Sequence, residues 1–165
     1  PEKLREVLAY VVEKIGARPN VGETVLYKLL YFIDFDHYEK YGRSVTGLTY
    51  IHNHFGPSPV ADFKSVVHGM QANGELEVIE TPYFKNTQKK YLPTRTVGFA
   101  HLSAQELAHI DQTLTRLADK SAKELTDLSH YDTPWVVARQ GQPLDYRDTF
   151  YRTKLTAVTE PEDDL

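Results

Sequence analysis

The sequence contains no cysteine among its 165 residues. Disulfides, thiolate zinc sites, iron–sulfur clusters and cysteine nucleophiles are therefore excluded together. No apolar run approaches the roughly 20 residues that a membrane-spanning helix needs, and no basic start leads into an apolar signal segment. We therefore expect a cytoplasmic protein with no membrane partner.

The chain also lacks an excess of positive charge. It has 23 acidic and 19 basic residues, and the four acids in its last seven residues account for the whole net charge of −4. The rest of the chain is neutral, whereas nucleic-acid-binding proteins usually carry a basic excess. With 41% hydrophobic and 12% aromatic residues, the chain can bury a core of its own. We expect one domain over residues 1–155 and an acidic, disordered tail over residues 156–165.

Helical periodicity dominates the first third of the chain. Apolar residues recur at helical spacing over residues 3–16, which predicts an amphipathic helix. The segment from Thr24 to Tyr41 is apolar around most of its circumference, which is typical of a helix in the middle of a domain. A third helix should follow, with Ser58 as its N-cap and Pro59 at its first position.

Capping signals predict three more helices in the second half. Capping boxes begin at Ser103 and at Ser121, each followed by Glu three residues later. A short last helix should start with Thr133 as its N-cap and Pro134 at its first position. The chain therefore predicts a mainly α, single-domain helical bundle around a central apolar helix.

One β-hairpin interrupts the helices, so the expected fold class is α+β. Residues 75–80 and 89–92 have the pattern of paired strands, with residues 84–88 as the tip. Helices followed by a hairpin loosely resemble a winged helix, in which Lys85, Lys89 and Lys90 would contact phosphates. A DNA-binding transcriptional regulator is thus the alternative function, although no basic recognition helix accompanies the hairpin.

No pattern of catalytic residues emerges. The chain has no Gly-x-Ser-x-Gly sequence, no phosphate-binding glycine loop and no dinucleotide fingerprint. Asp34 and His37 are spaced to share an ion, but with Asp36, His52 and His54 they match no named metal motif. We expect no enzyme, no metal and no cofactor.

Aromatic side chains point instead to protein binding. The chain has 11 tyrosines, and three of them lie on one stripe of the central helix. Tyrosine is enriched in protein–protein hot spots, although such rings can equally pack against neighbouring helices. A rigid Gly-Pro turn follows that helix. The predicted protein-contact residues are Tyr27, Tyr31, Tyr38, His54, Phe55 and Pro57.

Several motifs in a fixed order resemble one known family. They are Lys28–Phe32, Phe55–Val60, Leu102–Glu106 with Ile110 and Asp111, and Glu124–His130 running into Thr133–Trp135. Together they cover most of the chain from about Val21 to Trp135, and they resemble the Panacea domain of SocA-like antitoxins, which is also met in phage-associated proteins.

The resemblance implies a non-catalytic protein that neutralises a toxin encoded beside it by direct binding. Members of the family serve unrelated toxins, and the SocA type is associated with delivering its toxin to an AAA+ protease as an adaptor. The implied partners are therefore a cognate protein toxin and, for an adaptor, such a protease.

Overall fold

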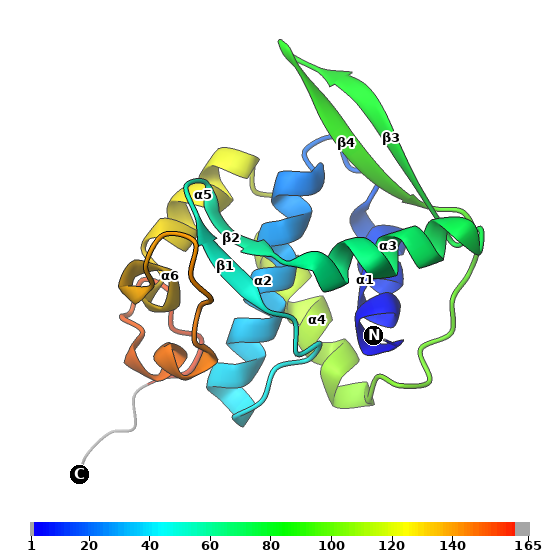
Figure 1. Cartoon of the computed structure of the whole chain (residues 1–165). Helices are drawn as coiled ribbons and strands as arrows, with labels where there is room; N and C mark the ends of the chain where they lie inside the picture. Colours follow the sequence, from blue (N-terminus) through cyan, green and yellow to red (C-terminus); the bar gives the residue numbers. More distant parts are fainter. Residues whose placement is uncertain (1, 161–165) are drawn as a thin grey trace.

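Helix α2 (Glu23–Tyr41) runs through the middle of the molecule in the computed structural model, which describes residues 2–160 (Figure 1). From Val25 to His37 every side chain except that of Tyr27 is buried, so the helix is covered on all sides. It ends where Gly42 adopts a left-handed φ of 73° and donates its N–H to the carbonyl of Tyr38. The prediction of a central helix over residues 24–41 is confirmed.

Six further helical segments accompany α2 within residues 2–160. They are α1 (Glu2–Ile15), α3 (Ala61–Ala72), α4 (Ala104–Leu117), α5 (Ala122–His130), α6 (Thr133–Val137) and the 3-10 helix η1 (Tyr146–Tyr151). Helices α4, α5 and η1 pack against α2, while α1 packs against α3 and the second hairpin. Both predicted capping boxes are confirmed, because Ser103 and Glu106, and likewise Ser121 and Glu124, exchange hydrogen bonds with each other's backbone.

Two antiparallel hairpins complete the fold, one more than the sequence predicted. Their strands are β1 (Tyr50–Asn53), β2 (Gly56–Pro59), β3 (Leu76–Tyr83) and β4 (Asn86–Pro93). The β3–β4 hairpin projects from the body of the molecule, whereas β1–β2 lies against α2 (Figure 1). The α+β fold class expected from the sequence is confirmed.

Asp34 fixes the chain as it leaves α2. The carboxylate is completely buried and accepts the backbone N–H groups of Val45 and Thr46 at 3.0 and 2.8 Å. It also accepts the hydroxyls of Thr46 at 2.6 Å and of Tyr50 at 2.8 Å. One buried carboxylate therefore positions the loop that leads into β1.

The predicted start of the third helix is wrong. Ser58 and Pro59 belong to β2, and α3 begins at Ala61 with Val60 as its N-cap. Proline drives the residue before it towards extended backbone, and the Gly-Pro-Ser-Pro sequence contains two such steps. The segment therefore pairs with β1 instead of opening a helix.

The expected start of the last helix also needs correction. Helix α6 begins at Thr133 itself, with Asp132 as its N-cap. The Asp132 carboxylate makes no capping hydrogen bond, because Tyr31 and Arg152 hold it. Just after Thr156, Glu39 of α2 accepts the backbone N–H groups of Val158 and Thr159. The remainder of the predicted acidic tail, residues 161–165, lies outside the described residues.

Candidate partner-binding face

Three of the four motifs that carry the family resemblance meet beside Lys28 of α2. A Cβ atom on Gly56 would lie 2.6 Å from Cε of Lys28 and 2.7 Å from Oγ of Ser129. Gly56 also has a φ of 112°, which disfavours every residue with a side chain. Glycine is thus required here for two reasons, and it brings β2, α2 and α5 into direct contact.

Trp135 attaches α6 to the first hairpin. Its indole is stacked between the rings of His52 and His130, with ring centroids 4.1 and 4.3 Å away. Its Nε1–H donates to the carbonyl of Asn53 at 3.3 Å. The short helix α6, which could not hold its place alone, is thereby held between β1 and α5.

A buried ion network attaches α6 and η1 to α2. The Arg152 guanidinium donates to both carboxylate oxygens of Asp132 at 2.8 and 2.7 Å, and Asp132 also accepts the Tyr31 hydroxyl at 2.5 Å. The same guanidinium donates to Asp36 at 2.6 Å and to Glu39 at 3.1 Å. The Arg152 side chain is 1% exposed, so its charge is removed from water. These hydrogen bonds to carboxylates take the place of its hydration.

Exposed apolar side chains gather on the elements that these contacts hold. We call them the α6 face: Phe55, Tyr131, Val136, Val137, Phe150 and Tyr151. Each is between 56% and 76% exposed. They lie on the tip of β1–β2, the end of α5, α6 and η1, which occupy the left side of Figure 1. Exposed apolar side chains grouped in this way are typical of protein-binding sites.

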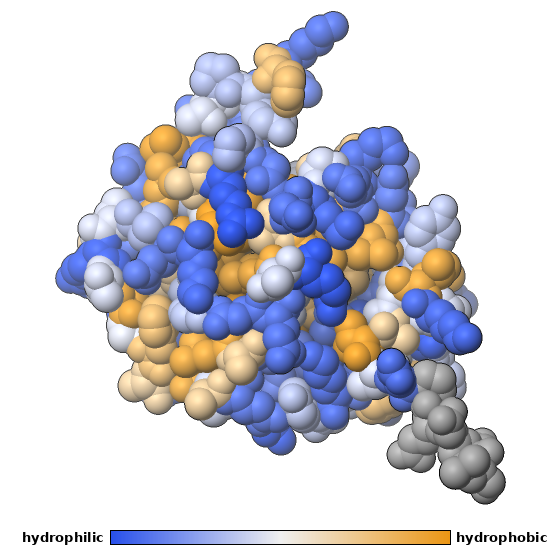
Figure 2. Space-filling view, turned by 180° about the vertical axis from the view of Figure 1, so that it is seen from behind, coloured by the Kyte–Doolittle hydropathy of each residue, from blue (hydrophilic) through white to orange (hydrophobic). Residues whose placement is uncertain are grey.

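Seen from behind, the molecule has a mixed surface. Figure 2 shows hydrophobic areas in several separate places among hydrophilic side chains. Among residues 2–160, six of the nine exposed large apolar side chains belong to the α6 face, on adjoining elements.

The predicted tyrosine face does not exist as an exposed surface. Tyr31 is completely buried, Tyr27 packs edge-on against Phe63, and Tyr38 stacks on Tyr146. Because α2 is surrounded by other elements, every stripe on it is covered, and the expectation that Tyr31 contacts a partner is wrong. Tyr27 and Tyr38 remain partly accessible, but they lie at opposite ends of the helix.

The predicted turn is divided between core and surface. Pro57 is buried, whereas His54 and Phe55 are exposed at the tip of the first hairpin. Phe55, at 67% exposure, belongs to the α6 face. The sequence analysis does not identify the other five members. A signal exists for Val136 and Val137, because a helix as short as α6 has too few neighbours to bury two adjacent valines.

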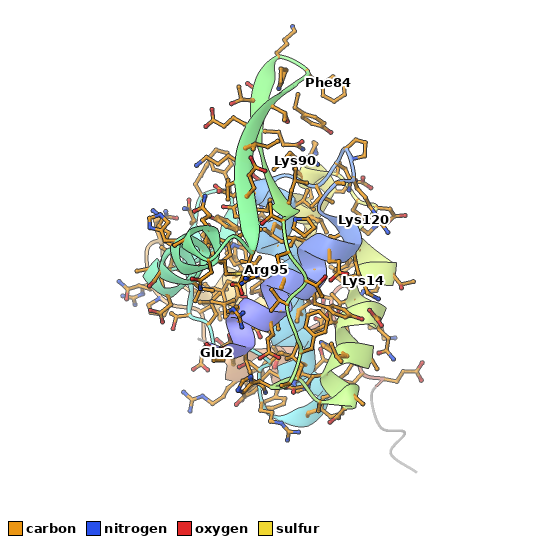
Figure 3. The ribbon with its side chains drawn as sticks, turned by 90° about the vertical axis from the view of Figure 1, so that its right-hand side faces the viewer. Glu2, Lys14, Phe84, Lys90, Arg95 and Lys120 are labelled. Atoms are coloured by element: carbon orange, nitrogen blue, oxygen red, sulfur yellow. The ribbon has the colours of Figure 1, made fainter. Side chains whose placement is uncertain are left out.

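The three predicted phosphate-contacting lysines have different surroundings. Lys85 and Lys89 are exposed, and Lys89 lies 4.0 Å from the Glu23 carboxylate. Lys90 is 8% exposed, and its ammonium donates to the carbonyls of Arg18 and Val21. Figure 3 shows Lys90 nearer the body of the molecule than Phe84 at the hairpin tip. The expectation that Lys90 contacts nucleic acid is therefore wrong.

Removing the cation of the buried network tests its role in the site. Arg152→Met leaves the carboxylates of Asp132 and Asp36 buried beside an apolar side chain, so the free energy of unfolding should fall by about 3–5 kcal/mol. Urea unfolding followed by circular dichroism measures the change. The matched control is Arg147→Met, whose side chain is 76% exposed and should change stability by less than about 0.5 kcal/mol. Equal stability of the two variants would contradict this assignment.

The buried ammonium of Lys28 gives a prediction about pH. Lys28 is 2% exposed, and burial lowers its pKa from 10.5 to about 8. Since the charged form is penalised in the folded state, Lys28→Met should raise the free energy of unfolding at pH 7 by on the order of 2–3 kcal/mol.

The sign of the pH dependence follows from the same shift. Between pH 8 and 10.5 the unfolded state binds more protons than the folded state, so this group makes stability rise with pH in that window. Lys28→Met should lack that rise, and the exposed control Lys64→Met should keep it. Urea unfolding at pH 7, 8, 9 and 10 gives the free energy of unfolding of each protein at each pH. The same dependence on pH in all three proteins would refute the prediction.

Comparison with known protein families matches the region that contains Lys28, Gly56 and Ser129, which meet beside α2. Neither a curated protein nor a solved structure matches the chain. Among residues 2–160, the structure contains no helix with the length and apolar character needed to cross a membrane. A family model described as the antitoxin SocA-like Panacea domain matches residues 26–136, from α2 into α6, which is more than half of the chain. The protein therefore belongs to the SocA-like Panacea family of antitoxin domains.

Proposed function

We propose that this protein neutralises a protein toxin by binding it directly through the α6 face. Membership of an antitoxin family supports a toxin partner in general and suggests a role other than catalysis. The observation that carries the proposal is the set of six exposed apolar side chains on adjoining elements. Burying them against a partner would remove apolar area from water, which is the main favourable contribution to most protein association.

The rigid support beneath this surface favours tight binding. Trp135 holds α6 against β1, and Arg152 holds both α6 and η1 against α2. A surface that is already ordered loses little conformational entropy when a partner binds. The α6 face can thus mask part of a toxin without rearranging itself.

The charge distribution supports a protein partner over DNA. With Lys90 buried, the exposed cations of the projecting hairpin are Lys85 and Lys89, and Lys89 lies beside Glu23. Binding to a DNA backbone relies on several cations that neutralise phosphates. The winged-helix alternative therefore has less support than direct binding of a toxin.

Substituting one member of the α6 face on each of three elements, the β1–β2 turn, α6 and η1, tests the proposal. The variant carrying Phe55→Ser, Val136→Ser and Tyr151→Ser should bind the product of the neighbouring gene at least about 10-fold more weakly, because hot-spot apolar anchors are lost. It should also fail to restore growth when that gene is expressed. The melting temperature should barely change, since these side chains are 56–76% exposed.

A matched control replaces exposed side chains elsewhere. Lys64→Ser, His68→Ser and Gln71→Ser lie on the exposed face of α3 and should leave both binding and growth rescue intact. Rescue by the α6-face variant at full strength would refute the proposed surface. Rescue accompanied by falling toxin levels that depend on an AAA+ protease would assign the adaptor mode, whereas constant toxin levels in a stable complex would assign masking alone.

A further inference from the structure

The tip of the β3–β4 hairpin carries an exposed aromatic ring on strained backbone. Phe84 is 91% exposed and has a φ of 54°, in the left-handed region. That conformation costs a residue with a Cβ roughly 1 kcal/mol, and glycine or asparagine would occupy it more easily. Figure 3 shows Phe84 at the far end of the projecting hairpin. Folding gains nothing evident from this ring, whose aromatic contact is with neighbouring Tyr83, edge-on at 4.7 Å.

The hairpin that presents this ring is firmly attached to the body. Lys90 donates to the carbonyls of Arg18 and Val21, and Gln88 donates to the carbonyl of Pro19 at 3.1 Å. The Tyr91 hydroxyl donates to Glu23 at 2.6 Å. These bonds fix β4 against the start of α2, so the tip is presented in a defined position.

We propose that Phe84, supported by Tyr83, is a second anchor for the toxin and inserts into an apolar pocket on it. The inference rests on the proposed function and extends it, because the same partner would be held at two places. Aromatic residues, Phe included, are enriched at protein–protein interfaces, and hot-spot residues lie in well-packed pockets.

The charge of the hairpin favours a protein pocket as the occupant. Its exposed ionic side chains are Glu77, Glu80, Lys85 and Lys89, two of each sign. A nucleic acid would require a net positive surface beside the ring, whereas a neutral surface with an apolar tip suits a protein pocket.

A groove leads from the hairpin to the start of α5. It has a volume of about 520 Å³ and lies between β4 and the start of α5, with Tyr83, Gln88, Ser121 and Lys123 in its walls. From Ser121, helix α5 leads to Tyr131, a member of the α6 face. A single partner that follows α5 could therefore reach both surfaces (Figure 1).

Phe84→Gly separates binding from folding. Glycine accepts a φ of 54° without strain, so the melting temperature should be unchanged or higher. Affinity for the product of the neighbouring gene, measured by isothermal titration calorimetry with the full chain, should fall at least about 10-fold. Phe84→Tyr keeps the ring and should stay within about threefold of the unmodified protein.

Each other outcome is decisive as well. Unchanged affinity of Phe84→Gly, with binding lost in the α6-face variant, overturns this inference and leaves the proposed function standing. Phe84→Gly could instead abolish self-association in sedimentation velocity, or binding to a 30-base-pair duplex, while toxin affinity stays unchanged. Either result assigns the tip to another occupant and also overturns this inference. Loss of toxin binding in Phe84→Gly alone upholds the anchor and refutes the α6 face. Failure of the unmodified protein to bind the toxin overturns both.

Discussion

The pairing of Arg152 with carboxylates from two directions is the constraint on which this structure depends. A desolvated guanidinium is tolerated only when its charge is balanced, and here Asp132, Asp36 and Glu39 balance it. Asp132 belongs to the turn before α6, whereas Asp36 and Glu39 belong to the central helix. Satisfying one buried cation therefore attaches α6 and η1 to α2.

This constraint links the family match to the residues outside it. The match ends at residue 136, but Asp132 and Asp36, which lie within it, receive their cation from Arg152, which lies outside it. The segment after α6 is thus an integral part of the domain. It also contributes Phe150 and Tyr151 to the α6 face, so the same segment serves stability and surface together.

The sequence predicts the elements whose signals are local. The central helix and both capping boxes follow from residues at most four apart, and the β3–β4 pairing follows from two strand patterns close together along the chain. The sequence does not predict the first hairpin, because the Gly-Pro-Ser-Pro segment is equally typical of a helix start. Its hydrogen bonding to β1 makes this segment a strand. Local patterns fail where a partner strand determines the conformation.

The candidate site is less predictable, because exposure is a property of the whole fold. Tyr31 is of a residue type that is common at protein interfaces. In the folded chain, however, its hydroxyl donates to the buried carboxylate of Asp132, 101 positions further along. The sequence identifies Phe55 because it lies in a rigid turn, whereas Tyr131 and Tyr151 carry no pattern that separates them from core residues. Which apolar side chains stay uncovered depends on how few elements surround α6.

The separation between the buried network and the exposed face has an evolutionary consequence. Substitutions at Phe55, Val136 or Tyr151 touch neither the ion network nor the packing around Gly56, so they are nearly free of a folding penalty. Surface and scaffold can therefore diverge at different rates. A lineage that keeps Arg152, Asp132 and Gly56 can exchange one partner for another by drift at a handful of exposed positions, and new specificities can arise without passing through an unstable ancestor.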